Sequence, residues 1–152
     1  MNDNQEPTIQ SSPIKNNYWS GYLLIFLATL GLLDALYLTS RYYKGAISCN
    51  VTNGCEEVLL SRYSHFGPVP IAMFGVAYYL VIIFVAILSL KYHQAIWRLV
   101  LKFLPAMGFL FSLWLLYIQA FILKYFCQYC LLSALTSTLI FIASLWLYKK
   151  EK

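Results

Sequence analysis

Charged residues are scarce in this chain of 152 residues: Asp, Glu, Lys and Arg together make up 11%, whereas hydrophobic residues make up 61%. A soluble domain typically has about 25% charged and about 45–50% apolar residues. So little charge cannot cover a surface that faces water, which excludes a soluble globular enzyme, a disordered chain and a secreted disulfide scaffold. The net charge of +5 does not indicate nucleic-acid binding, because the basic residues lie at the ends of apolar segments.

Four apolar stretches are long enough to cross a bilayer, at about 22–40, 70–90, 103–123 and 127–148. A bilayer core needs about 20 apolar residues in helical form, and a segment in lipid must satisfy its backbone as a helix or in a closed barrel. These stretches are continuously apolar instead of alternating with a period of two, which favours helices. The sequence therefore predicts an all-α integral membrane protein, a four-transmembrane-helix bundle formed by residues 18–149.

The distribution of basic residues predicts the orientation of this bundle. With four spans, both termini and the loop between spans two and three share one side, which carries seven Lys and Arg residues against four on the other side. The positive-inside rule then places both termini in the cytoplasm, including the polar tail 1–17, which we expect to be disordered. The loop 42–69 lies outside, and within it Glu56–Tyr63 has the acidic start and Gly-Pro stop of a short helix.

All four cysteines fall on the outer side in this topology, where disulfides persist in bacteria. Cys49 and Cys55 lie in the long loop, and Cys127 and Cys130 form a C-Q-Y-C motif at the start of span four. The C-x-x-C spacing brings two sulfurs within bonding reach, and the helix N-terminus favours the Cys127 thiolate that attacks disulfides. One mobile dithiol above one fixed dithiol fits an electron relay. A structural staple and a four-thiolate metal site remain as alternatives.

Several segments together resemble the bacterial homologues of vitamin K epoxide reductase across roughly residues 20–148. They are G-L-L-D-A-L-Y-L-T at 31–39, the loop cysteines, E-E-V-L-L-S-R-Y-S at 56–64, F-G-P-V-P-I-A-M-F-G at 66–75 and C-Q-Y-C at 127–130. The DsbB-type quinone reductases also combine four helices with two dithiols. Their C-x-x-C pair lies in the first outer loop, however, and the order in this chain is the reverse.

The resemblance implies a disulfide/quinone oxidoreductase in the bacterial inner membrane, with its cysteines on the periplasmic side. By analogy, Cys49 and Cys55 are the shuttle pair, Cys127 takes electrons from Cys55, and Cys130 faces a quinone, either ubiquinone or menaquinone. Because we expect no thioredoxin-like domain to be fused to the bundle, a separate periplasmic thioredoxin-like (DsbA-like) carrier is the implied partner, which the protein would reoxidise to support disulfide bond formation. The alternatives are a quinone or vitamin K epoxide reductase and a non-enzymatic membrane protein that binds metal through four cysteines.

The resemblance also bears on the quinone contacts. Ser61 matches a serine that lies near the quinone ring, in the short loop helix. Animal relatives hold the quinone oxygens with an Asn in span two and a Tyr in span four. The matching positions in this chain are near Ile71 and Ala134, whose side chains cannot donate a hydrogen bond. This departure argues against vitamin K epoxide as the substrate and leaves the quinone contacts undefined.

Five further residues are candidates for the site. Phe126 and Tyr129 flank the C-x-x-C motif and are expected to line a quinone pocket. Gln119, on span three, is a second candidate for a quinone contact, with a hydrogen bond between helices as the alternative. Asp34 is the only charge within the four spans, and a carboxylate inside a membrane is a candidate for proton handling, as is His65 in the loop. No metal site is expected.

Overall fold

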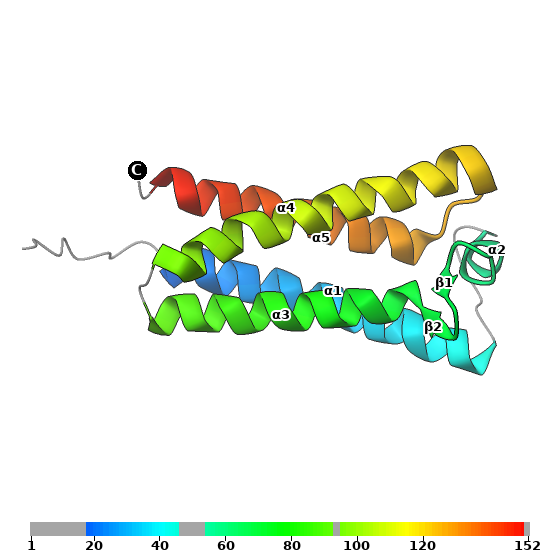
Figure 1. The fold of residues 1–152 in the computed structure, drawn as a ribbon, viewed down its shortest axis with the longest axis horizontal. Helices are drawn as coiled ribbons and strands as arrows, with labels where there is room; N and C mark the ends of the chain where they lie inside the picture. Colours follow the sequence, from blue (N-terminus) through cyan, green and yellow to red (C-terminus); the bar gives the residue numbers. More distant parts are fainter. Residues whose placement is uncertain (1–17, 46–53, 93–94, 151–152) are drawn as a thin grey trace, which may run out of the picture.

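The computed structural model describes residues 18–45, 54–92 and 95–150 (Figure 1). In chain order its elements are α1 (Tyr18–Lys44), α2 (Cys55–Leu59), β1 (His65–Phe66), β2 (Val69–Pro70), α3 (Ile71–Lys91), α4 (Ala95–Tyr117), the π-helix η1 (Ile118–Leu123) and α5 (Gln128–Lys150). Four helical stretches within these elements are long and apolar enough to cross a membrane: Gly21–Lys44, Ile71–Lys91, Leu99–Leu123 and Gln128–Trp146. The predicted four-helix membrane bundle is thereby confirmed, and the chain is a multi-pass membrane protein.

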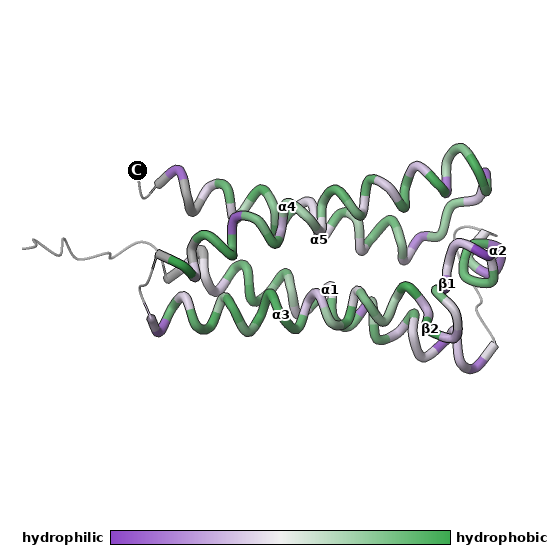
Figure 2. The backbone as a smooth tube through the Cα atoms, in the orientation of Figure 1, coloured by the Kyte–Doolittle hydropathy of each residue, from purple (hydrophilic) through white to green (hydrophobic). Residues whose placement is uncertain are grey.

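The outer surface of the bundle is apolar, as a lipid-facing surface must be. Figure 2 shows hydrophobic residues along most of each long helix, with hydrophilic ones gathered towards the helix ends. Large side chains that are more than half exposed come from all four long helices: Phe26, Phe84, Leu110, Trp114 and Ile142. Exposure of so much apolar surface to water would cost about 25 cal/mol for each Å², whereas lipid accepts it.

The central core lies where α1 packs against both α3 and α5. Its buried members are Leu24, Ala28, Ala35, Tyr79, Ile82 and Ile140. The α1 contribution includes two alanines, and such small residues let transmembrane helices approach closely.

Gly31 shows how close that approach is. The Tyr79 side chain of α3 lies against Gly31 of α1, and a Cβ atom added at Gly31 would fall 2.4 Å from the ring. The Tyr79 hydroxyl continues across the core to α5, where it lies 3.1 Å from the carbonyl oxygen and 3.0 Å from the hydroxyl of Ser133. One tyrosine thus connects three helices, because a glycine makes room for its ring.

Residues 54–70, which precede α3, fold over one end of the bundle, which we call the cysteine end (Figure 1). The loop helix α2 has Gly54 as its N-cap and ends at Leu59, so it starts one residue before the predicted Glu56–Tyr63 segment and stops four residues earlier. The Ser64 hydroxyl donates to the Leu59 carbonyl and to the Ser61 carbonyl at 2.9 Å. Ser64 therefore satisfies carbonyl groups that the end of a short helix leaves without partners.

A two-stranded hairpin then leads into α3. Strands β1 and β2 are antiparallel, with Phe66 opposite Val69, and Gly67 in the connecting turn has φ +64°, a conformation that favours glycine. Each strand has only two residues, too few for a recognisable alternation, so the sequence did not predict them. The backbone N–H of Ile71 donates to the Ser64 carbonyl at 2.8 Å, which fixes the hairpin to the start of α3.

The end of the third span is a π-helix instead of a continuous α-helix. Element η1 directly follows α4 and stops before Lys124, whose φ is 57°. The π-helix has wider turns than the α-helix and occurs often at functional sites. The sequence did not predict it, because I-Q-A-F-I-L has no residue that requires the wider turn.

We expect Gly31→Ala to destabilise the bundle, because its Cβ atom would overlap the Tyr79 ring. Overpacking of this kind costs about 1–3 kcal/mol, and the loss is measured by thermal unfolding of the purified protein in detergent. Gly75→Ala is the matched control at the same helix pair, since a Cβ atom there would lie 3.5 Å from the Ala35 Cβ, an ordinary contact. Equal melting temperatures for the two variants would contradict the packing argument.

Candidate active site

Cys127 forms the N-cap of α5. Its carbonyl accepts a hydrogen bond from the backbone N–H of Leu131 at 3.0 Å, and its own N–H donates to Gln119 Oε1 at 3.2 Å. Gln119 is buried and comes from η1, so the π-helix supplies the side chain that holds the backbone of the first C-x-x-C cysteine. A hydrogen bond between helices is the alternative role that the sequence suggests for Gln119, and such a bond is present. Its acceptor is the Gln119 side-chain oxygen, and its donor is a backbone N–H group.

The surroundings of Cys127 favour its thiolate. A hydrogen bond from the Cys130 thiol, helped by the backbone N–H groups of Cys130 and Tyr129, lowers the pKa of Cys127 to about 7, against the opposing effects of burial and of Asp34. N–H groups at a helix N-terminus stabilise negative charge in this way. Near neutral pH a large share of Cys127 is therefore a thiolate, the form that attacks disulfides.

The first residue of α2 lies against this motif. Cys55 and Cys127 are both buried, 1% and 0% exposed, in one cluster with Leu38, Val58 and Leu59. Cys55 is disulfide-bonded, whereas Cys127 and Cys130 carry free thiols. Cys49 lies outside the described residues. The structure thus brings together three of the four predicted cysteines, from segments far apart in the sequence.

Gly54 allows the loop to come this close. A Cβ atom at Gly54 would lie 2.9 Å from Tyr125 Cβ and 3.1 Å from the backbone nitrogen and oxygen of Phe126. Its backbone dihedrals, φ −102° and ψ −1°, are available to any residue, so the need for glycine here is steric. The loop backbone therefore packs directly on the segment that precedes Cys127.

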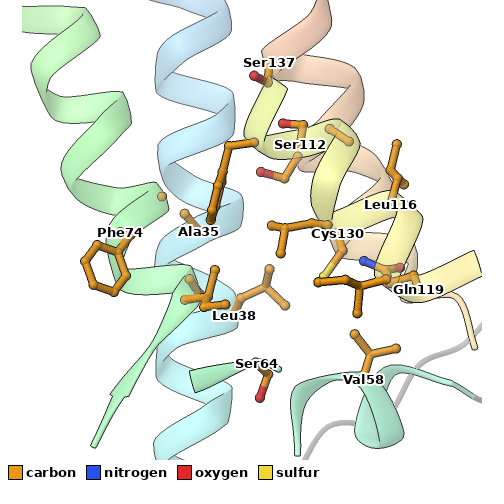
Figure 3. A pocket seen from close by; sticks show the side chains of 18 of the residues that line it. Ala35, Leu38, Val58, Ser64, Phe74, Ser112, Leu116, Gln119, Cys130 and Ser137 are labelled. Carbon is orange, nitrogen blue, oxygen red and sulfur yellow. The ribbon is translucent and has the colours of Figure 1, made fainter. Parts of the chain in front are cut away.

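An apolar cavity of about 420 Å³ lies beneath α2, between the helices. Its walls come from α1, α3, α4, η1 and α5, and residues in and just after α2 close one end (Figure 3). Cys130 is part of the wall, whereas Cys127 and Cys55 are not. Both thiols of the C-x-x-C motif thus pack with the cluster that contains Cys55, but only Cys130 also faces the cavity.

Four residues singled out from the sequence line this cavity: Ser61, Gln119, Ile71 and Ala134. The Ser61 hydroxyl donates to the Val58 carbonyl at 2.7 Å. Ile71 and Ala134 present only apolar atoms, as their residue types require. A polar ligand would therefore need other donors from this wall.

Phe126 and Tyr129 do not line the cavity, although the sequence suggested that they would. The Phe126 side chain is exposed, because its backbone packs on Gly54. The Tyr129 ring points to α1, where its centroid lies 5.0 Å from that of Tyr37. Flanking positions in C-x-x-C point to other faces of the helix than Cys130 does, which explains the difference.

The two candidates for proton handling occupy different places. Asp34 is buried, its Oδ2 has no hydrogen-bond partner among the described residues, and it is close enough to Cys130 to interact electrostatically. His65 is half-buried in β1, with its ring centroid 6.5 Å from that of Tyr42, and does not line the cavity. Asp34 interacts electrostatically with both thiols of the C-x-x-C motif.

A metal site needs several His, Cys, Asp or Glu side chains close together. Within the described ranges no three His, Cys, Asp or Glu side chains lie close enough together to hold an ion.

A membrane helix bundle with an activated thiol pair beside an apolar cavity has the architecture of a membrane thiol oxidoreductase. A family model described as "Vitamin K epoxide reductase family" matches residues 22–145. The match covers most of the chain, and it includes Asp34 in α1 and the C-x-x-C motif at the start of α5. The chain therefore belongs to the vitamin K epoxide reductase family, and it is an oxidoreductase of the membrane.

We expect Gly54→Ala to move Cys55 away from Cys127. In a Cys49→Ala/Cys130→Ala background these two thiols are the only cysteines, and mild oxidation should join them in high yield, as read by mass spectrometry of non-reduced peptides. Gly54→Ala should lower that yield severalfold, because its Cβ atom meets backbone that cannot yield. Glu57→Gln, an exposed change on the same helix, is the control, and an unchanged yield in Gly54→Ala would contradict the steric argument.

The pKa of Cys127 gives a pH prediction. In a Cys49→Ala/Cys55→Ala background, thiolate absorbance in the ultraviolet should rise with pH and show a first midpoint at about 7. Cys130→Ala removes the strongest hydrogen bond to the thiolate, so the midpoint should move to higher pH. A midpoint that stays in place would show that the Cys130 thiol does not stabilise the Cys127 thiolate.

Proposed function

We propose that this protein reoxidises a thioredoxin-like disulfide carrier and passes the electrons through Cys49–Cys55 and then Cys127–Cys130 to a membrane quinone. The observation that carries the proposal is the different position of the two cysteines in the C-x-x-C motif. Cys127 is buried with Cys55, and Cys130 lines the apolar cavity. A relay needs such an arrangement, because one thiol must meet the donor and the other the acceptor.

The proposed steps conserve electrons and bonds. A carrier thiolate attacks Cys49, which breaks the Cys49–Cys55 disulfide, and the second carrier thiol completes the exchange. The Cys55 thiolate then attacks Cys127, so the Cys127–Cys130 disulfide breaks and Cys130 leaves as a thiolate. Attack of Cys49 on Cys55 restores the loop disulfide and frees Cys127. Each disulfide broken is replaced by one formed, and two electrons reach the inner pair.

The oxidation states in the structure fit one point in this sequence of steps. Cys55 is disulfide-bonded and both inner cysteines are free thiols. This is the state expected after the inner pair has been reduced and the loop disulfide has formed again. The Cys127 thiolate is stabilised in that state, which supports a role for Cys127 in the exchange with the loop.

The cavity suits a quinone. Its apolar walls exclude water and fit a flat, largely hydrophobic ring, as ligand pockets of this size commonly do. A bound quinone supplies the acceptor for two electrons. The protein's part is to hold the ring beside Cys130, keep water away from it, and deliver two protons together with the two electrons.

The orientation follows the charge bias, with the cysteine end towards the periplasm of a bacterial inner membrane. The first long helix begins, and the last ends, at the opposite end of the bundle (Figure 1), which agrees with both termini in the cytoplasm. A periplasmic location would give a soluble carrier direct access to the loop. In this reading the protein supports disulfide formation in secreted proteins.

We expect Cys127→Ala and Cys130→Ala each to abolish quinone reduction when the purified protein is mixed with a reduced thioredoxin-like carrier, because each removes one partner of the inner disulfide. Quinone absorbance follows the reaction. Ser144→Ala, a change in the same helix away from the cavity, should keep full activity. Undiminished turnover in either cysteine variant would refute the relay.

Asp34 is proposed to handle the protons. Its side chain is buried and acts electrostatically on Cys130, and one of its oxygens has no hydrogen-bond partner among the described residues. Both observations support proton exchange between Asp34 and the reacting thiol. Loss of a general acid or base typically slows a reaction at least about a hundredfold. Asp34→Asn should lower the turnover number by about that factor and flatten its pH dependence, while quinone affinity stays the same. Normal turnover with a small change in stability would instead assign Asp34 a structural role.

A further inference from the structure

Two buried hydroxyl groups in the cavity wall have no hydrogen-bond partner within the described part of the chain: Tyr78 Oη on α3 and Ser137 Oγ on α5. Ser137 is only 2% exposed. The two groups are close neighbours, but their geometry is not that of a hydrogen bond to one another. An unpaired polar group in apolar surroundings is costly, so a pair of them aimed at one cavity calls for an explanation.

The other hydroxyls in the cavity wall are already engaged, apart from that of Tyr63, whose side chain is exposed. Ser112 donates to the Gly108 carbonyl at 2.9 Å, Tyr79 bonds to Ser133, and Ser61 and Ser64 serve the end of α2. The lack of partners is therefore specific to Tyr78 and Ser137. It is not a general property of this wall.

Their position relative to Cys130 is defined by the helix. Ser137 follows Cys130 by seven residues, which places both on one face of α5 with two turns, or about 10 Å, between them. Figure 3 shows Ser137 at the end of the cavity away from Val58 and Ser64, with Cys130 between. The Tyr78 hydroxyl reaches this deep end because of Gly108, where a Cβ atom would lie 2.2 Å from it.

We infer that Tyr78 and Ser137 donate hydrogen bonds to a carbonyl oxygen of the quinone, whose ring occupies the cavity between them and Cys130. This inference rests on the proposed function. A quinone carbonyl has no donor of its own, so it matches two hydroxyl donors, and two helical turns leave room for one ring. The donors also lie where the oxygen gains negative charge on reduction, when such bonds become stronger.

The test measures binding without turnover. In a Cys127→Ala/Cys130→Ala background, the dissociation constant of a short-chain ubiquinone is determined by equilibrium dialysis in detergent, with menadione as the second probe. Loss of one hydrogen bond should weaken binding about threefold to tenfold in Tyr78→Phe and again in Ser137→Ala. Ser144→Ala is the matched control, because Ser144 is buried on the same helix but already donates to the Phe141 carbonyl.

The melting temperature of the same variants is a second readout, because removal of a hydroxyl with a structural role would not raise it. Without quinone, Tyr78→Phe and Ser137→Ala remove an unsatisfied group, so the melting temperature should rise by about 2–4 °C, whereas Ser144→Ala should not raise it. Unchanged affinity in the Tyr78→Phe/Ser137→Ala double variant would overturn the inference and leave the proposed function standing. So would a lower melting temperature in Tyr78→Phe. Failure of both quinones to bind even the parent protein would overturn the proposed function as well.

Discussion

A polar atom inside a lipid-facing bundle must find a partner or raise the free energy of the fold. In this protein that constraint shapes the site more than any single contact. The backbone N–H of Cys127, at the start of a helix, has no acceptor within its own helix, and the amide of Gln119 supplies one at 3.2 Å. The π-helix that carries Gln119 thus serves the same requirement as the hydrogen bond between Tyr79 and Ser133 in the core.

Close packing at three glycines is the second constraint on the site. Gly31 admits the Tyr79 ring between α1 and α3, Gly54 seats the loop on the backbone before Cys127, and Gly108 leaves space for the Tyr78 hydroxyl. At each place the missing Cβ atom is what allows the approach. The Tyr79 ring, the loop that carries Cys55 and the Tyr78 hydroxyl can therefore take their positions because the opposing residue is a glycine.

Much of this architecture is readable from the sequence, and the limits have physical causes. Continuous apolar runs predict the four spans, and the order of the cysteines led to the family that the comparison confirms. The hairpin, the π-helix and the exposed position of Phe126 were not foreseen, because each depends on contacts between segments distant in the chain. Tyr78 and Ser137 are likewise ordinary residues in apolar helices, and only the three-dimensional structure reveals that their hydroxyls are unpaired.

The loop helix α2 has two roles at once, since it begins with Cys55 and also closes one end of the cavity through Val58 and Leu59. A displacement that carries Cys55 outwards to another protein must also lift this cover. Dissolved oxygen and water would then reach the reduced thiols only while α2 is displaced. The movement that admits the donor would therefore also set the rate at which electrons are lost to oxygen, so the two rates would change together.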